Sequence, residues 1–72
     1  MSDRVYRLVE LAGSSEKSIS DAIEVAITRA SSSLRNLGWF EVTQIRGHIA
    51  DGKIDQYQVS LKVGFTLEPG SD

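Results

Sequence analysis

The sequence of 72 residues contains no cysteine and only one histidine. Disulfides and thiolate metal sites are therefore excluded, and so is a histidine-rich metal site. A chain without cysteine suits the reducing cytoplasm, which is the compartment we expect. Small folds usually need a disulfide, a metal or partner subunits to be stable. Oligomerisation is therefore the way in which we expect this chain to enlarge its core.

A strong excess of one charge is also lacking, as are long apolar runs. The formal net charge is −2, and the eight Lys and Arg residues are scattered along the chain. A nucleic-acid-binding domain favours a basic excess, which is not found here. No apolar stretch approaches the roughly 20 residues of a membrane span, and the N-terminus lacks the apolar core of a signal peptide. We predict one domain over residues 1–72 that binds neither nucleic acid nor membranes.

The hydrophobic pattern predicts an α+β fold in the order β-α-β-β. Alternation predicts a first strand over residues 5–11, ended by the Gly-Ser-Ser of residues 13–15. Ser18 should cap a helix, with Asp21 reaching back to it, although Ser14 or Ser15 could also serve as the cap. An apolar stripe then runs from Ile19 to Leu37. Gly38 stands where a glycine would end that helix. Two more strands follow over residues 39–49 and 54–67, and residues 69–72 form a solvated tail.

The Asp51-Gly52 pair predicts a two-residue hairpin turn between the last two strands. Such a turn pairs residues whose numbers sum to 103, such as Val42 with Leu61 on the side of the helix. This register predicts a three-stranded antiparallel sheet packed against one helix. A three-residue loop or a bulge would shift this register by one residue and so reverse the faces. The remaining pairs that it predicts are Phe40 with Val63 and Gln44 with Val59 beneath the helix, and Trp39 with Gly64, Glu41 with Lys62, Thr43 with Ser60 and Ile45 with Gln58 on the other face.

The only tryptophan, Trp39, begins a strand after the expected end of the helix, and Gln58 lies on the neighbouring strand on the same predicted face. An indole and a carboxamide suit a flat heterocycle with a hydrogen-bonding edge. A lone tryptophan at such a junction is more often an ordinary packing residue. The surrounding sequence is therefore needed to decide.

Long stretches of the sequence resemble the dodecins, a family of small flavin-binding proteins that assemble as hollow shells of twelve subunits. The resemblance covers nearly the whole chain, and several motifs occur in the family's order. The motifs that carry it are VYRLVEL at residues 5–11, LRNLGWFEV at 34–42, RGHI at 46–49 and YQVSLKVGF at 57–65.

The resemblance implies a role for three residues. Trp39 matches the family tryptophan that stacks on the isoalloxazine ring, with stacked flavins held between indoles of neighbouring subunits. Gln58 matches the glutamine that hydrogen-bonds the pyrimidine edge of the ring. Arg46 matches a basic position near the ligand. The implied function is storage of FMN or riboflavin, or of FAD, by a homododecamer that limits free flavin and its photochemistry without catalysis.

Three positions qualify what the resemblance implies. Thr66 stands where many bacterial relatives have a basic residue, which weakens the case for a contact with coenzyme A. Ile19 replaces an aromatic residue often found at the start of the helix. The predicted register places Arg46 on the helix side, opposite Tyr57. Either a bulge near Gly47 turns Arg46 outward, or its role is structural.

Two other classes of function compete with flavin storage. An enzyme would need an activated nucleophile, and the candidates are His48, the serines of residues 31–33 and the carboxylates Asp51 and Asp55. The more ordinary interpretation is that His48 lies at a solvated strand end and that the serines form a small-residue surface. The two carboxylates would then simply flank a soluble hairpin. A structural shell or interaction module would use Trp39 as an interface residue only. Uptake of flavin, visible as a yellow colour, distinguishes the two binding hypotheses.

Overall fold

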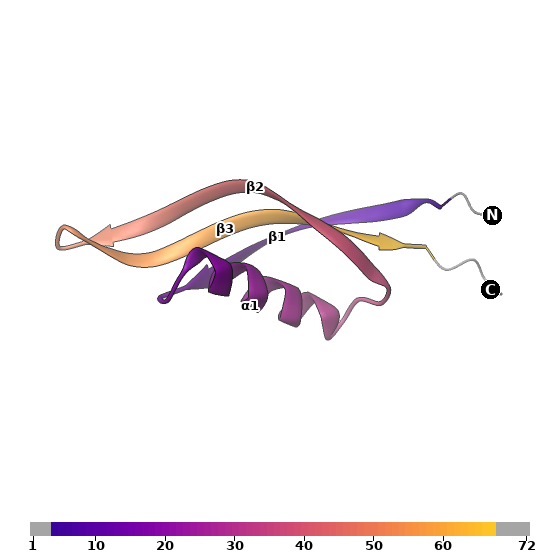
Figure 1. Ribbon diagram of the computed structural model, residues 1–72, viewed down its shortest axis with the longest axis horizontal. Helices are drawn as coiled ribbons and strands as arrows, with labels where there is room; N and C mark the ends of the chain where they lie inside the picture. Colours follow the sequence, from indigo (N-terminus) through magenta and orange to yellow (C-terminus); the bar gives the residue numbers. More distant parts are fainter. Residues whose placement is uncertain (1–3, 68–72) are drawn as a thin grey trace.

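One helix lies across one face of a three-stranded antiparallel sheet (Figure 1). The computed structural model describes residues 4–67, and the predicted tail at residues 69–72 lies outside them. The strand order in the sheet is β1-β3-β2, so β3 is central. The predicted α+β class and the order β-α-β-β are confirmed. The elements are β1 (Tyr6–Ser15), α1 (Ile19–Ser31), β2 (Leu37–Ala50) and β3 (Lys53–Thr66).

The buried core joins a stripe of alanines on α1 to three aliphatic side chains on β3. Alanines at every fourth position lie on one face of the helix, and alternate residues of β3 lie beneath them. Among residues 4–67, only the three β3 residues contribute large, fully buried side chains. The core is therefore thin. Its members are Ala22, Ala26, Ala30, Val59, Leu61 and Val63.

The helix approaches β1 closely at Gly13. A Cβ atom at this position would lie 2.1 Å from the carbonyl oxygen of Ala22 and 2.9 Å from the Cβ of Ala26. No side chain fits there, so the glycine serves the contact between helix and sheet. The prediction of a strand over residues 5–11 that the Gly-Ser-Ser of residues 13–15 breaks is wrong at its end, because β1 continues through Ser15.

The start of α1 confirms Ser18 as the capping residue, and its hydroxyl accepts a hydrogen bond from the Asp21 amide at 2.9 Å. The second half of the predicted capping box is wrong. The Asp21 carboxylate accepts a hydrogen bond from the Ser15 hydroxyl at 2.7 Å. Ser15 in turn accepts from the Ser18 amide at 3.4 Å, and so takes the place that Asp21 would have had.

The helix ends at Ser31, six residues before the predicted end at Leu37. The Ser31 and Ser32 hydroxyls donate to main-chain carbonyls of the preceding turn, at 2.9 and 2.7 Å. Serine side chains that bond to their own backbone compete with continued helix. These serines therefore close the helix. Gly38 is not a helix cap but the extra residue of an irregularity near the start of β2, between Leu37 and Trp39.

The Asp51-Gly52 turn is confirmed, with φ values of 53° and 75° that suit a tight hairpin turn. The predicted register holds near the turn and again from Trp39 to Val42. Between these regions it is wrong by one residue, because Asp55 in β3 and Thr43 in β2 are each an extra, bulged residue. The two bulges compensate each other.

The shifted register reverses the sides predicted for three consecutive residues of β2. Ile45 pairs with Val59 and so lies on the helix side of the sheet, whereas it had been expected on the other side. Gln44 pairs with Ser60 and Arg46 with Gln58. Cross-strand partners share a face, so Gln44 and Arg46 point away from the helix. The outward orientation of Arg46 thus follows from bulges at Thr43 and Asp55.

The fold leaves much apolar surface uncovered. The radius of gyration is 15.0 Å, whereas a compact domain of this length has about 11 Å. The hairpin of β2 and β3 projects beyond the helix (Figure 1), and near its tip Ile49 and Ile54 are 72% and 61% exposed. Large exposed apolar surfaces mark sites of association. The other exposed large hydrophobic residues are Val5, Tyr6, Leu8, Ile19, Val25, Trp39, Phe40, Ile45 and Leu67.

Candidate ligand-binding face

The face of the sheet that points away from α1, called the open face here, carries all three predicted binding residues. Alternate residues of a strand point to opposite faces, so Gln58 and Gly64 of β3 lie opposite to the buried Val59 and Val63. Trp39 pairs with Gly64, and Arg46 pairs with Gln58. Trp39, Arg46 and Gln58 therefore share the open face.

The indole of Trp39 lies directly beside Gly64. A Cβ atom at residue 64 would lie 2.5 Å from both Cε2 and Cζ2 of the indole and 2.9 Å from its Nε1. The ring of Tyr6 meets the indole edge to face, with centroids 5.8 Å apart and planes at 66°. Trp39 remains 39% exposed. The indole is thus held by its neighbours and still offers surface to a ligand.

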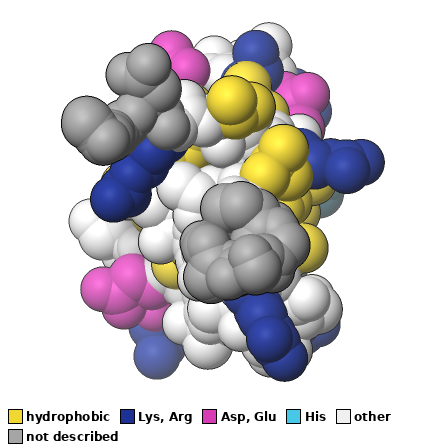
Figure 2. All heavy atoms as spheres, turned by 90° about the vertical axis from the view of Figure 1, so that its right-hand side faces the viewer, with side chains coloured by type: hydrophobic (Ala, Val, Ile, Leu, Met, Phe, Trp, Pro, Cys, Tyr) yellow, Lys and Arg dark blue, Asp and Glu magenta, His cyan; other side chains and the backbone are white. Residues whose placement is uncertain are grey.

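An apolar strip lies on this end of the molecule. Hydrophobic side chains form a strip between Lys and Arg side chains on the end where β1 and β2 begin (Figure 2). Next along the open face comes a charged row in which Lys62 pairs with Glu10 on one side and Glu41 on the other. The predicted pairing of Glu41 with Lys62 is confirmed. The charged row separates the aromatic end of the face from a polar end.

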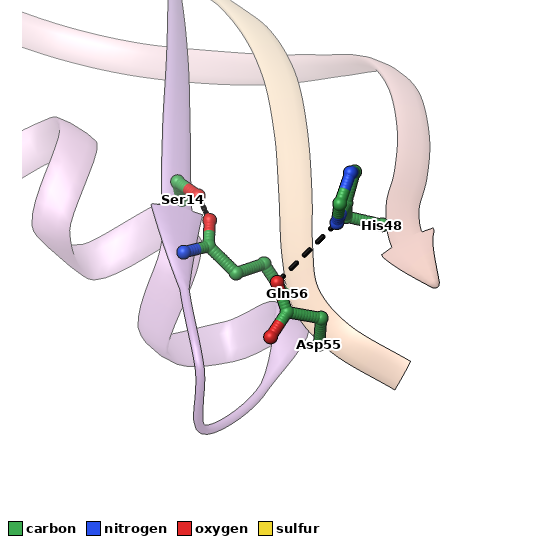
Figure 3. Close-up of polar contacts among 4 residues, drawn as sticks. All are labelled: Ser14, His48, Asp55 and Gln56. Carbon is green, nitrogen blue, oxygen red and sulfur yellow. Dashed lines mark hydrogen bonds and ion pairs between the residues drawn. The ribbon is translucent and has the colours of Figure 1, made fainter. Parts of the chain in front are cut away.

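The polar end contains Gln58 and Arg46. The Arg46 guanidinium donates a hydrogen bond to the Gln44 carboxamide, which fixes its direction along the strand. Gln58 is half-buried, and its carboxamide makes no side-chain hydrogen bond within residues 4–67. Gln56, two residues away, is already engaged, because it accepts a hydrogen bond from the Ser14 hydroxyl at 2.5 Å (Figure 3). Of these two glutamines, Gln58 is the one available to a ligand.

His48 lies beside Asp55, with Nδ1 and Oδ2 3.3 Å apart (Figure 3). Both side chains are largely exposed to solvent. Ser14 lies on the other side of β3 from His48, and its hydroxyl donates to Gln56 (Figure 3). The serines proposed for an enzyme, Ser31 and Ser32, donate to helix carbonyls. Their hydroxyl protons are thus used in hydrogen bonds at the end of the helix.

A single copy of the chain does not bring Trp39 and Gln58 together. Trp39 lies opposite Gly64, and Gly64 is six residues from Gln58 along β3. At roughly 3.3 Å per residue this separation is about 20 Å. The shared face that the sequence predicted is confirmed, but the indole and the carboxamide do not lie side by side within one chain.

Within residues 4–67 no helix is long and apolar enough to cross a membrane. The same part of the chain contains no group of three or more His, Cys, Asp or Glu side chains that could hold a metal ion. The candidate site on the open face consists of the aromatic, amide and guanidinium groups of Trp39, Gln58 and Arg46.

Comparison with known proteins identifies the family. A family model described as Dodecin matches residues 5–68. The chain belongs to the dodecin family. It is 51% identical over 65 residues to the dodecin of Thermus thermophilus, which covers 90% of this chain and 94% of that protein. The predicted resemblance to dodecins is confirmed.

Solved dodecin structures have the same fold. The dodecin from Streptomyces coelicolor superposes with a TM-score of 0.90 at 51% identity, covering 96% of this chain and 99% of that one. The dodecin from Streptomyces davaonensis gives 0.89 at 44% identity, with 94% and 100% covered. The three-stranded sheet with one helix is thus the fold of this dodecin family.

The contact between Gly64 and the indole predicts the result of Gly64→Ala. The added methyl group would occupy space that the indole now fills, so the ring must move toward solvent. We expect the emission of Trp39, the only tryptophan, to shift to longer wavelength and its near-ultraviolet circular dichroism to weaken.

Ser60→Ala is the matched control, because Ser60 lies on the same strand and the same face but next to Gln44. It should leave the Trp39 spectra unchanged. Identical spectra for Gly64→Ala and the native protein would contradict the close seating of the indole.

Proposed function

We propose that this dodecin binds and stores flavin, as FMN or riboflavin, and that it does so without catalysis. The observation that carries the proposal is the open face itself. It presents a fixed, partly exposed indole at Trp39 and an unengaged carboxamide at Gln58. FAD contains the same ring system and belongs to the same ligand class.

The chemistry of the two groups matches the isoalloxazine ring. Offset stacking on an aromatic side chain adds about 0.5–1.5 kcal/mol beyond the burial of area. The imide edge of the ring has an N–H flanked by carbonyls, and a carboxamide supplies both a donor and an acceptor to it. Trp39 would therefore stack on the ring, and Gln58 would bond to its edge.

The separation of about 20 Å between Trp39 and Gln58 supports a site shared by subunits. One ring can meet both groups only if they come from different copies of the chain. The large exposed surface supports the same conclusion. The chain of 7.9 kDa exposes 5389 Å² in total, whereas a compact monomer of this mass exposes roughly 4,400 Å². We propose a homo-oligomer, and a homododecamer by analogy with the family.

Arg46 belongs to the proposed site because the bulges turn it to the face of Gln58. Its guanidinium would meet the far side of the ring or the phosphate of FMN, since guanidinium groups bind phosphate through two parallel hydrogen bonds. Thr66 offers no charge to a second phosphate. Coenzyme A is therefore not favoured as a ligand.

The proposed role is storage in the cytoplasm. An electron-rich indole stacked on an excited flavin provides a fast route for quenching, which limits photochemistry of the bound ring. Two of the three serines considered as nucleophiles, Ser31 and Ser32, donate their hydroxyl protons to helix carbonyls. This bonding is typical of serines at the end of a helix and supports a binding protein over an enzyme.

A titration of FMN with the purified protein tests the proposal. We expect strong, saturable quenching of FMN fluorescence, which Trp39→Ala abolishes because the stacking partner is lost. Gln58→Ala should weaken binding about tenfold, because the buried edge of the ring loses its hydrogen bonds.

Gln56→Ala is the matched control, since it removes a carboxamide of the same face that is already bonded to Ser14. It should bind FMN nearly as the native protein does. No quenching by the native protein would reject flavin storage and leave the interaction module as the better hypothesis.

The native mass tests the proposed assembly. Twelve copies of a 7.9 kDa chain have a mass of about 95 kDa. We expect this value from light scattering coupled to size-exclusion chromatography, in buffer without flavin. A mass of one or two chains at micromolar concentration would contradict the assembly.

Mixed assemblies test whether one site draws on two copies. Trp39→Ala and Gln58→Ala chains are expressed together, so that each chain lacks one of the two groups. If the groups come from different copies, random mixing restores about a quarter of the sites to native affinity. Separately purified variants, mixed without exchange of subunits, are the control. No restored sites in the mixed assembly would place both groups on one chain.

A further inference from the structure

We propose that Tyr6 is a positioning residue that holds the indole of Trp39 in its binding orientation before any ligand arrives. The effect on flavin affinity rests on the proposed function. The effect on the indole itself does not, because it is measured in the protein without ligand.

Tyr6 and Trp39 meet across an intervening strand. Tyr6 belongs to β1 and Trp39 to β2, and β3 lies between them. Two strand spacings amount to about 10 Å, yet the ring centroids are 5.8 Å apart. The two side chains therefore lean toward each other over β3.

Two glycines leave the space for this contact. A Cβ atom at Gly64 of β3 would meet the indole at 2.5 Å, so any side chain there would push the ring away. A Cβ atom at Gly38 of β2 would lie 3.4 Å from Cε1 of Tyr6, so the phenol ring extends as far as β2. Glycine beneath an aromatic side chain from the next strand is a known way of filling a gap in a sheet.

The contact restricts a side chain that would otherwise be free to move. Trp39 is on an outer strand of the sheet and is 39% exposed. A ligand that stacks on a mobile ring must first order it, and this ordering lowers the affinity. Gly64 and Tyr6 confine the indole from two directions. Tyr6 thereby removes part of the ordering cost.

The edge-to-face geometry distinguishes a positioning role from simple filling of space. Aromatic pairs prefer such arrangements over a face-to-face sandwich, with centroids 4.5–7 Å apart, because of the charge distribution of their rings. Phenylalanine keeps the ring and its geometry. Leucine keeps apolar volume but has no ring. The two substitutions at residue 6 therefore separate the two roles.

The experiment compares Tyr6→Phe, Tyr6→Leu and the native protein, first without ligand. The chain has one tryptophan, so acrylamide quenching of tryptophan emission reports on Trp39 alone, and so do the circular dichroism bands of tryptophan at wavelengths longer than those at which tyrosine absorbs. We expect Tyr6→Leu to weaken the tryptophan bands and increase quenching, and Tyr6→Phe to retain native values. FMN affinity should fall about three- to tenfold in Tyr6→Leu and stay native in Tyr6→Phe.

Tyr57→Leu is the matched control, because it removes the other tyrosine at the far end of the sheet, where it pairs with Gly47. It should leave the Trp39 signals unchanged. Should Tyr6→Leu fail to fold, Tyr6→Ile takes its place, since β-branched residues favour strands.

Native Trp39 signals in a folded Tyr6→Leu or Tyr6→Ile protein would overturn the proposal, and so would an equal change in Tyr6→Phe. A native protein that binds no FMN would reject flavin storage alone. The spectra without ligand would still decide the role of Tyr6.

Discussion

The close approach of α1 to the sheet is the constraint on which the rest of the structure depends. Ala22 and Ala26 present little volume, and Gly13 presents none, so the helix backbone lies almost against β1. A core formed in this way is thin and covers the middle of only one sheet face. The open face and the projecting hairpin stay uncovered. The chain thus folds in a manner that leaves its second face for other molecules.

Backbone irregularities decide which side chains lie on the open face. The bulges at Thr43 and Asp55 shift a short part of the hairpin by one residue and then restore the register. Within that part, Arg46 is turned to the side of Gln58, and Ile45 is turned to the side of the helix. A regular hairpin of the same sequence would place the guanidinium on the opposite face.

The sequence was sufficient for features with strong local signals. Asp51-Gly52 predicts its turn because both residues tolerate positive φ, and Ser18 predicts the helix start by its hydroxyl. The end of the helix was missed because the apolar period continues past Ser31, while the serine hydroxyls stop the helix. A bulge near Gly47 was considered, but the positions of the two bulges were missed, because nothing about Thr43 or Asp55 in the sequence marks an extra residue.

The candidate site was predictable in part for the same reasons. Trp39 and Gln58 were placed on the correct face. Trp39 lies in a part of β2 where the predicted register holds, and Gln58 lies in a part of β3 that alternates regularly. Their separation follows from counting residues along β3. The contact of Tyr6 with Trp39 joins strands that are not neighbours, so pairing rules do not find it. The signal available in the sequence was Gly64, a glycine paired with the only tryptophan.

The paired bulges make this hairpin tolerant of a change in chain length in an unusual way. Thr43 and Asp55 have no partner in the register across the hairpin, so loss of either residue would leave every cross-strand pair as it is. Arg46 would stay opposite Gln58, and the turn and the base of the hairpin would also be kept. Relatives that lack one of these two residues would therefore present the same open face.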